Sequence, residues 1–254
     1  MPVWDPAHYA RFADHRLRPA QDLLARVPPG ERGRIVDLGC GAGQVTRLLR
    51  ERWPAAEITG VDSSPTMLQR ARAEVPATAY VEADVAGWRP PMPVDLIVSN
   101  ATLQWLPDHG RLLVDLVRHL TPGGVLAVQM GANHAARSHK LIAEVAADGP
   151  WAVALAGIGG IVPVEPARHY AALLLPCVAA VDAWSTVYEH VLEGADPVLE
   201  WVKGTTLRPY LDALGPGAEP FVEAYRARLR TAYSPELDGR TLYGFRRVFV
   251  VAIR

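Results

Sequence analysis

Between residues 34 and 130, short apolar segments alternate with segments whose apolar residues recur at helical spacing. Strands that alternate with helices pair in parallel, because a crossover helix returns the chain to the same end of the sheet. The predicted strands are 34–39, 57–62, 78–84, 94–100 and 124–130, and the predicted helices are 43–53, 64–75 and 110–120. This alternation predicts an α/β fold with a mostly parallel sheet.

Two helices are predicted before the first strand. Trp4, Asp5 and Pro6 form a typical helix start, with Asp5 as the N-cap and Pro6 in the first turn. A second helix is predicted over 18–27, ending before Pro28.

After residue 130 the pattern changes to helical segments that are rich in glycine and proline. Strand-like stretches return at 177–192 and 245–254. We therefore expect a single domain, residues 1–254, in which 131–176 and 194–240 form a helical cap inserted between strands of the sheet.

The composition argues against several classes of protein. A formal net charge of −1 gives no field that would attract nucleic acid or an anionic membrane. Two cysteines do not make a disulfide framework, and the N-terminal residues lack the basic and apolar regions of an export signal. The most apolar stretches, 152–164 and 171–181, are too short and too interrupted to cross a bilayer. We expect a cytoplasmic protein that binds neither nucleic acid nor membrane.

The segment "DLGCGAG", residues 37–43, lies where the first predicted strand turns into a helix. Glycines at such a turn let the backbone approach a ligand closely, and the helix N-terminus presents free N–H groups. A tight turn without a ligand would also explain the glycines. Asp62 and Asp84 end the next two predicted strands, at the edge where open α/β sheets bind ligands. A carboxylate at the position of Asp62 can accept hydrogen bonds from ribose hydroxyls, although a helix cap is the alternative.

The surroundings of the turn discriminate between nucleotide cofactors. No lysine lies near the glycines, so the loop that clamps nucleoside triphosphates is absent. The spacing is GxGxG and not the GxGxxG of dinucleotide-binding folds, and Asp37 would repel a pyrophosphate. An ammonium group would suit that carboxylate. S-adenosylmethionine, with an amino acid head, a ribose and an adenine, fits these groups best.

Five motifs in order, "VDLGCGAG", "GVDSS", "VEADV", "DLIVSNATLQW" and "LTPGGVLAVQM", resemble the class I S-adenosylmethionine-dependent methyltransferases. Other stretches, including "WDPAHYARFADHRLRP", "WVKGTTLRPYL" and "FRRVFVVA", resemble the trans-aconitate methyltransferase family within that class. The resemblance covers nearly the whole chain and is weakest over 131–176. It implies a Rossmann-like, mostly parallel seven-stranded sheet with an antiparallel C-terminal strand.

The resemblance also implies the reaction, which is methyl transfer from S-adenosylmethionine to a carboxylate of trans-aconitate or a similar polycarboxylic acid. A carboxylate is already ionised at neutral pH, so no general base is required and catalysis rests on positioning. A class I methyltransferase acting on a hydroxyl or amine is the alternative, and would need a base such as His134 or His139. A cofactor-binding module without catalysis is a third hypothesis.

Carried over by motif, the predicted cofactor residues lie at the ends of the first four strands. Asp37, Gly39 and Gly41 are assigned to the methionine part, Asp62 to the ribose, Asp84 and Val85 to the adenine, and Ser63, Met67 and Asn100 to further contacts. Met67 faces adenine only if its helix starts at Pro65, and packing in the core is the alternative. A loop cap is the alternative for Asn100.

A polycarboxylate requires guanidinium groups together with amide or hydroxyl donors. The predicted substrate residues are Arg18, Gln104, Trp105, Trp201, Arg208, Tyr210 and Arg247. Packing is the alternative for the aromatic residues, and a surface charge is the alternative for the arginines. Trp4 and Tyr9 could close over the cofactor or anchor the N-terminal helix. No cluster has metal-ligand spacing, so no metal is expected.

Overall fold

The computed structural model describes residues 13–158 and 162–254, which form two compact units. The sheet unit comprises 14–131, 162–186 and 247–254, and the helical unit comprises 132–158 and 187–246. The boundary between the units falls within the last two strands of the sheet.

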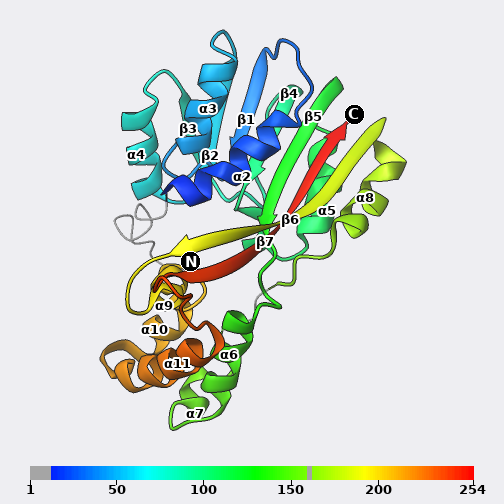
Figure 1. The fold of residues 1–254 in the computed structure, drawn as a ribbon. Helices are drawn as coiled ribbons and strands as arrows, with labels where there is room; N and C mark the ends of the chain where they lie inside the picture. Colours follow the sequence, from blue (N-terminus) through cyan, green and yellow to red (C-terminus); the bar gives the residue numbers. More distant parts are fainter. Residues whose placement is uncertain (1–12, 159–161) are drawn as a thin grey trace. The chain divides into compact units, whose positions relative to one another are not determined.

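The seven strands form one sheet in the order β3-β2-β1-β4-β5-β7-β6 (Figure 1). The strands are β1 (Arg34–Leu38), β2 (Glu57–Asp62), β3 (Ala79–Glu82), β4 (Val94–Asn100), β5 (Leu120–Gly131), β6 (Ala180–Leu192) and β7 (Thr241–Ile253). Strands β1 to β5 pair in parallel, and β7 pairs with β5 in the antiparallel direction. The predicted mostly parallel sheet with an antiparallel C-terminal strand is confirmed.

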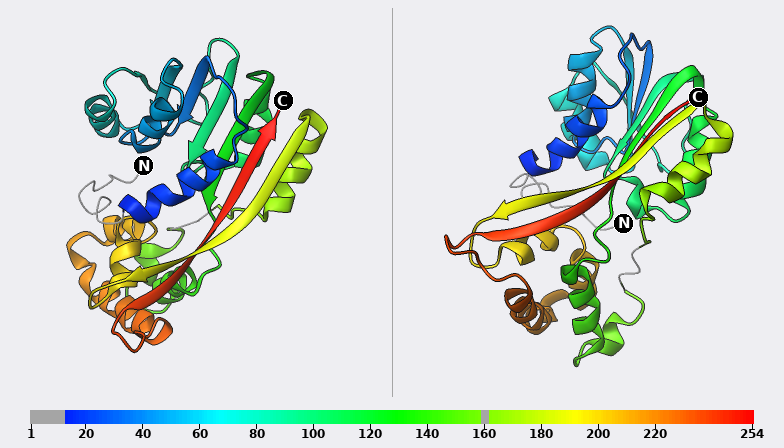
Figure 2. Two further views of the ribbon diagram at one scale, coloured as in Figure 1. Left: turned by 45° about the horizontal axis from the view of Figure 1, so that its top comes forward. Right: turned by 45° about the vertical axis from the view of Figure 1, so that its right-hand side comes forward.

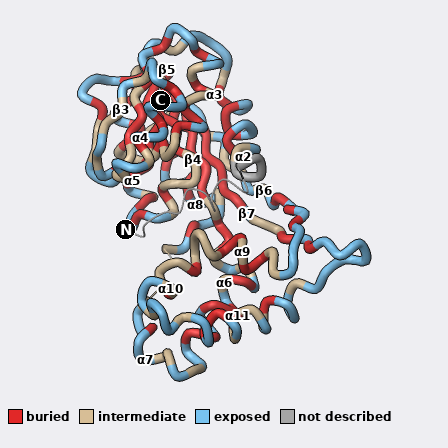
Figure 3. The backbone as a smooth tube through the Cα atoms, turned by 90° about the vertical axis from the view of Figure 1, so that its left-hand side faces the viewer, coloured by how far each residue is buried: buried red, intermediate tan, exposed pale blue. Residues whose placement is uncertain are grey.

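Helices cover both faces of the sheet in the sheet unit. They are α2 (Ala13–Ala25), α3 (Gln44–Arg52), α4 (Pro65–Glu74), α5 (His109–Val117) and α8 (Ala167–Leu174), with the short 3₁₀ turns η1 (Leu103–Trp105) and η2 (Leu175–Cys177). The right-hand view of Figure 2 shows α2 and α3 on one face and α5 and α8 on the other. Strands covered on both sides are expected to be apolar along their length. Leu96, Ile97 and Val98 in β4 are fully buried, and β4 runs through the buried interior in Figure 3.

The helical unit contains α6 (Arg137–Ala147), α7 (Ala152–Leu155), α9 (Pro197–Lys203), α10 (Arg208–Leu214), the turn η3 (Gly215–Gly217) and α11 (Glu219–Ala232). Its core is built from aliphatic residues and from aromatic residues, among them Trp201, Tyr210, Phe221, Tyr225 and Tyr243. Leu192 of β6 and Tyr243 of β7 also belong to this core, which gives the helical unit its own source of hydrophobic stability.

One segment predicted for the cap lies elsewhere. Residues 162–176 were expected in the cap, but they belong to the sheet unit, where α8 packs against α5. The Tyr170 hydroxyl of α8 lies 2.7 Å from Nε2 of the buried His109 in α5. Local periodicity identifies a helix but does not say which surface its apolar face will cover.

Two strands begin earlier than predicted. β5 starts at Leu120 and not at residue 124. Val94 of β4 pairs with Leu120, but Leu96 pairs with Val125, so the register of β5 shifts in the segment that contains Gly123 and Gly124. β7 starts at Thr241 and not at Phe245. A Cβ added at Gly244 would lie 3.0 Å from the Glu189 carboxylate, so this glycine permits a close approach within a strand.

The remaining boundaries differ by a few residues, as is usual at element ends. The helix predicted over 18–27 corresponds to α2, which begins earlier, at Ala13, and ends at Ala25. Pro19 lies inside this helix. The predicted helix start at Trp4, Asp5 and Pro6 lies outside the described residues. Within the described part of the chain, no helix is long and apolar enough to cross a membrane.

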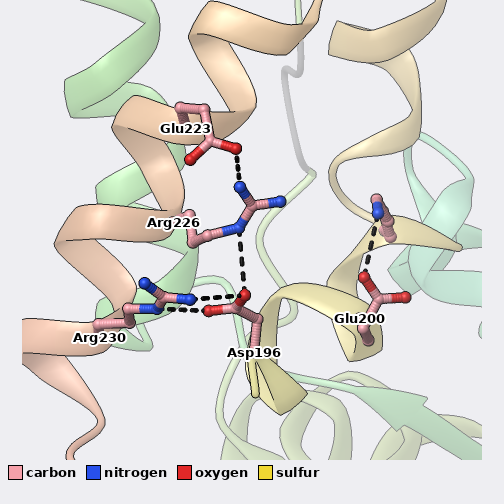
Figure 4. A network of polar contacts seen from close by, with 6 residues as sticks. Asp196, Glu200, Glu223, Arg226 and Arg230 are labelled. Atoms are coloured by element: carbon pink, nitrogen blue, oxygen red, sulfur yellow. Dashed lines mark hydrogen bonds and ion pairs between the residues drawn. The ribbon is translucent and has the colours of Figure 1, made fainter. Parts of the chain in front are cut away.

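Charged side chains connect α9 to α11 in the helical unit (Figure 4). The Asp196 carboxylate, at the start of α9, accepts two hydrogen bonds from Arg230, at 2.7 and 3.0 Å. Nε of Arg226 lies 3.2 Å from the same carboxylate, and Arg226 also pairs with Glu223. Only 17% of the Asp196 side chain is exposed, so water screens these pairs less than it screens an ordinary surface pair.

We predict that Asp196→Ala lowers the free energy of unfolding by about 1–2 kcal/mol, because one partly buried carboxylate pairs with two guanidinium groups. Chemical denaturation measures this change. Asp238→Ala, which removes an exposed pair with Arg240, is the matched control and should leave the free energy of unfolding close to the wild-type value. Equal effects of the two substitutions would contradict the prediction.

Candidate active site

The turn between β1 and α3 holds three glycines in the left-handed region, with φ of 81° at Gly39, 54° at Gly41 and 90° at Gly43. The first two differ in what surrounds them. A Cβ at Gly39 would lie 2.2 Å from the Thr102 side chain, whereas a Cβ at Gly41 would meet no atom within 4 Å. Gly39 therefore makes room for Thr102, while the backbone at Gly41 borders open space that a ligand can approach.

Hydrogen bonds from β2 hold this turn in place. The N–H groups of Gly39 and Cys40 both donate to the Val61 carbonyl oxygen, at 2.7 and 3.0 Å. Oδ2 of Asp62 accepts from the Gly41 N–H at 2.9 Å, and Oδ1 accepts from the Ser64 N–H at 2.9 Å. Asp62 thus shapes the turn, a role the sequence pattern did not reveal. Each of its oxygens keeps a lone pair for the predicted ribose hydroxyls.

Asp37 is the penultimate residue of β1 and is 1% exposed. Its Oδ2 accepts a hydrogen bond of 2.6 Å from the Thr46 hydroxyl on α3. Burial raises the pKa of the Asp37 carboxyl to about 7, although the bond from Thr46 acts in the opposite direction, and the nearby charge of Asp62 raises the pKa further. A buried carboxylate with little compensation favours a cation beside it, which is what the ammonium group of S-adenosylmethionine would supply.

The other predicted cofactor residues follow β2, β3 and β4. Asp84 accepts a hydrogen bond from the Ala86 N–H at 3.0 Å, and Val85 is buried. Helix α4 starts at Pro65, as the predicted contact of Met67 with adenine requires. The Ser64 side chain caps this helix by accepting a hydrogen bond from the Met67 N–H. Ser63 is partly exposed between Asp62 and this cap. These contacts with adenine and ribose stay predictions.

At the end of β4, Asn100 Oδ1 is buried and has no hydrogen-bond partner among the described residues. The oxygen is therefore not a loop cap within that part of the chain. The next residue, Ala101, has a left-handed φ of 55°, an uncommon conformation for a residue with a Cβ. Strained backbone beside an unpaired buried oxygen is typical of a ligand site.

Four of the predicted substrate residues belong to the sheet unit. Gln104 donates from Nε2 to the Ala101 carbonyl at 2.6 Å, and its Oε1 is buried without a partner in the described chain. Trp105 is 46% exposed, and Arg18 is exposed on α2. Arg247 in β7 is buried, and its Nη1 lies 3.3 Å from Oε1 of Gln129.

The other three belong to the helical unit. Trp201 and Tyr210 lie in the core, where Trp201 stacks on His190 and Tyr210 on Phe221. These are the packing contacts given as the alternative for aromatic residues. Nε of Arg208 donates to Asp212 at 2.8 Å on a partly exposed helix face. Substrate contacts of these three residues stay predictions.

The predicted alternative base His139 lies in a polar cluster that the sequence pattern did not reveal. Its Nδ1 is 3.1 Å from the Ser138 hydroxyl, and its Nε2 is 3.0 Å from the Thr206 hydroxyl. Burial lowers the pKa of His139 to about 4, and His134 adds to this effect. A ring with such a pKa, occupied at both nitrogens, is a weak base at neutral pH.

Tyrosines from separate segments surround Ser138. Tyr225 donates to the Ser138 carbonyl at 3.0 Å, Tyr233 accepts from its N–H at 3.0 Å, and Tyr243 lies 3.1 Å from its hydroxyl. These residues are far apart in sequence, so no local pattern could have grouped them.

Among the described residues, no group of three or more His, Cys, Asp or Glu side chains could hold a metal ion.

Residues 35–124 match the model of a family described as a methyltransferase domain. The chain is 50% identical to the trans-aconitate 2-methyltransferase of Azoarcus sp. strain BH72, with all of both chains covered. It is 49% identical to the protein of the same name from Streptomyces avermitilis, over 99% of this chain and 97% of the relative.

Two solved structures show the same fold. The YcgJ protein of Bacillus subtilis aligns with a TM-score of 0.60 at 13% identity, over 95% of this chain and 98% of that one. A phosphoethanolamine N-methyltransferase of Haemonchus contortus aligns with a TM-score of 0.56 at 18% identity, over 93% of this chain and 52% of that one. The sheet order, the antiparallel β7 and the glycine turn with its acidic neighbours define a class I S-adenosylmethionine-dependent methyltransferase. Within this class, the full-length identity is decisive, and the chain belongs to the trans-aconitate 2-methyltransferase family.

Because the raised pKa of Asp37 leaves the carboxyl increasingly protonated below about pH 7, we predict that S-adenosylmethionine affinity falls as the pH drops from 7 to 5.5. Asp37→Asn keeps the size of the side chain and the acceptor for Thr46 but not the charge. It should weaken binding about 10- to 100-fold at pH 7 and flatten this pH dependence. Calorimetric titration at several pH values measures both effects.

Asp95→Asn is the control, because Asp95 binds the N–H groups of Gly33 and Arg34 at the opposite end of the sheet. It should keep the wild-type affinity and pH dependence. A folded Asp37→Asn variant with wild-type affinity would show that the cofactor ammonium does not contact this carboxylate.

The lowered pKa of His139 has a consequence for stability. The folded protein binds fewer protons than the unfolded chain between about pH 6.5 and 4, so stability should fall as the pH drops through this range. The ring is partly exposed, and we expect a loss of about 2 kcal/mol. His139→Gln should reduce this loss in urea unfolding at pH 7.5 and 4.5, whereas exchange of the exposed His169 for Gln should not. Identical pH dependence in all three proteins would refute the assignment.

Proposed function

We propose that this chain transfers the methyl group of S-adenosylmethionine to a carboxylate of trans-aconitate, giving a monomethyl ester and S-adenosylhomocysteine. The observation that carries the proposal is the 50% identity, over the whole length of both chains, to a protein named for this reaction. The acidic ends of β1, β2 and β3 are consistent with the cofactor.

When bound, the cofactor supplies an electrophilic methyl carbon on a sulfonium. A substrate carboxylate, with a reference pKa near about 4, is ionised at pH 7. One of its oxygens forms a bond to the methyl carbon as the carbon–sulfur bond breaks, and that electron pair remains on sulfur. Positive and negative charge cancel, and no proton moves. The reaction therefore needs no general base.

The residues of the chain then act by binding and alignment. In this proposal Asp37, which binds the Thr46 hydroxyl, also pairs with the amino group of the cofactor, and Asp62, which binds the Gly41 N–H, also accepts from its ribose. Alignment of reacting atoms about 3 Å apart, with water excluded, can lower a barrier by roughly 7–11 kcal/mol. This is the order of contribution that positioning alone has to make here.

A tricarboxylate also needs cationic partners, and the arginines proposed for this role have different environments. Arg247 is 5% exposed, so its charge acts in a medium of low polarity. The Arg208 side chain is 35% exposed, so water screens its charge more strongly. We therefore assign the strongest anion contact to Arg247, with Arg18 and Arg208 as further candidates.

We also infer a cytoplasmic location and small-molecule partners only. Cys40 and Cys177 are free thiols, which suits a reducing compartment. The formal net charge of −1 gives no general attraction for nucleic acid.

The test is incubation with S-adenosylmethionine and a panel of carboxylic acids, followed by mass spectrometry of the products. We predict a monomethyl ester from trans-aconitate and, with the cofactor saturating, a kcat that is nearly flat from about pH 6.5 to 9, because the acceptor stays ionised. Methylation of a hydroxyl or amine in place of the acid, with a rate that rises with pH, would favour the alternative with a general base. Binding of the cofactor without any methyl transfer would indicate a non-catalytic module.

A further inference from the structure

Polar side chains form a row on one face of the sheet, near the carboxyl ends of β1, β4 and β5. Asp37 pairs in register with Val98, and Asn100 pairs with Gln129. Because side chains at alternate positions of a strand share a face, and paired positions share it too, Asp37, Asn100 and Gln129 point to the same side. Arg247 of β7, opposite Gly131, continues the row.

The orientation of the Gln129 amide is fixed by its neighbour. Gln129 is fully buried, and Nη1 of Arg247 lies 3.3 Å from its Oε1. A guanidinium group has only donors, so the amide oxygen must face it and the amide nitrogen must point elsewhere. Nε2 has no hydrogen-bond partner within the described chain. A buried donor without a partner is costly, which is why such groups are rare unless a ligand completes them.

The polarity of the row changes along the sheet. Asp37 and Oδ1 of Asn100, on β1 and β4, are acceptors. Nε2 of Gln129 and the Arg247 guanidinium, on β5 and β7, are donors. Acceptors suit the cationic head of the cofactor, and donors suit an anionic substrate. Open α/β sheets bind ligands at this edge. Hydrogen-bond acceptors therefore lie on β1 and β4, where the cofactor is expected, and hydrogen-bond donors lie on β5 and β7, where the anionic substrate would bind.

We propose that Gln129, together with Arg247, forms a receptor for a substrate carboxylate that is not methylated, and so selects acids with more than one carboxylate. The inference rests on the proposed function and adds to it a specificity-determining residue, Gln129. Nε2 donates to one oxygen of this carboxylate, while the guanidinium binds the anion and orients the amide.

The chemistry of the transfer says which carboxylate is held. The reacting oxygen loses its negative charge as the ester forms, so a cation paired with it would stabilise the ground state more than the transition state. A carboxylate that keeps its charge throughout gains the same stabilisation in both states and serves as an anchor. The donor end of the row therefore suits the anchoring carboxylate.

The test uses the full chain with Gln129→Met, which keeps the length of the side chain and removes the donor, and with Gln129→Glu, which replaces the donor with a charged acceptor. Gln129→Met should lower kcat/KM for trans-aconitate about 10- to 100-fold, mainly through KM, and Gln129→Glu should lower it further. The wild type should strongly prefer trans-aconitate to crotonate, which has one carboxylate, and both variants should lose most of that preference.

A binding measurement separates substrate recognition from damage to the fold. Calorimetric titration of trans-aconitate into the complex with S-adenosylhomocysteine should show the same loss of affinity, while affinity for S-adenosylhomocysteine itself stays at the wild-type value. Thr121→Val is the matched control, because Thr121 lies at the other end of β5 and donates its side-chain hydrogen bond to Asp95. It should behave as the wild type.

The outcomes are distinct. If the wild type methylates trans-aconitate and Gln129→Met keeps its KM and its preference over crotonate, the inference is overturned and the proposed function stands. Equal losses of acid and cofactor affinity in Gln129→Met would overturn it too, since they would indicate a purely structural role. A wild type that neither binds nor methylates any acid of the panel overturns the proposed function and this inference with it.

Discussion

The candidate site depends on the attachment of the glycine turn to the adjacent strand. Two successive N–H groups, those of Gly39 and Cys40, donate to one carbonyl oxygen at Val61, and the Asp62 carboxylate accepts from Gly41. These bonds hold the turn in backbone conformations that only glycine adopts readily. The backbone of Gly41, which borders open space, takes its position from this attachment. Asp62, predicted as a ribose contact or as a helix cap, is thus also part of the framework that supports the glycine turn.

Two buried groups of opposite charge, Asp37 and Arg247, determine which ligands the site favours. Burial of Asp37 makes an ionised carboxylate unfavourable until a cation is present, while Arg247 brings a buried cation whose guanidinium contacts the Gln129 amide. Both charges lie in the sheet unit, near the carboxyl ends of its strands. In a medium of low polarity such groups interact strongly with ligands of opposite charge, and alignment of two oppositely charged reactants is the main task in a transfer that needs no base.

Much of this was accessible from the sequence, for identifiable reasons. The alternation of strands and helices, the turn glycines and the aspartates that end β1 and β2 are local features, so their positions along the chain predict their positions in the sheet. The prediction failed where neighbours in space decide the outcome. Residues 162–176 were assigned to the cap, but α8 packs on α5, and its Tyr170 is bonded to His109. The start of β7 was missed because Gly244 interrupts the apolar pattern. The structure shows why a glycine suits this position, since a Cβ there would lie 3.0 Å from the Glu189 carboxylate of β6.

The sequence by itself determined the parallel sheet, its antiparallel last strand through the resemblance, and the acidic, glycine-rich edge, because each depends on residues close together in the chain. Only the tertiary structure decided what side chains from distant segments do to one another. It placed Trp201 and Tyr210 in a core, lowered the pKa of His139 by burial, and set Gln129 of β5 against Arg247 of β7 with its amide nitrogen unpaired in the described chain. Burial and hydrogen bonding between such segments are properties of the packed fold, and no local pattern encodes them.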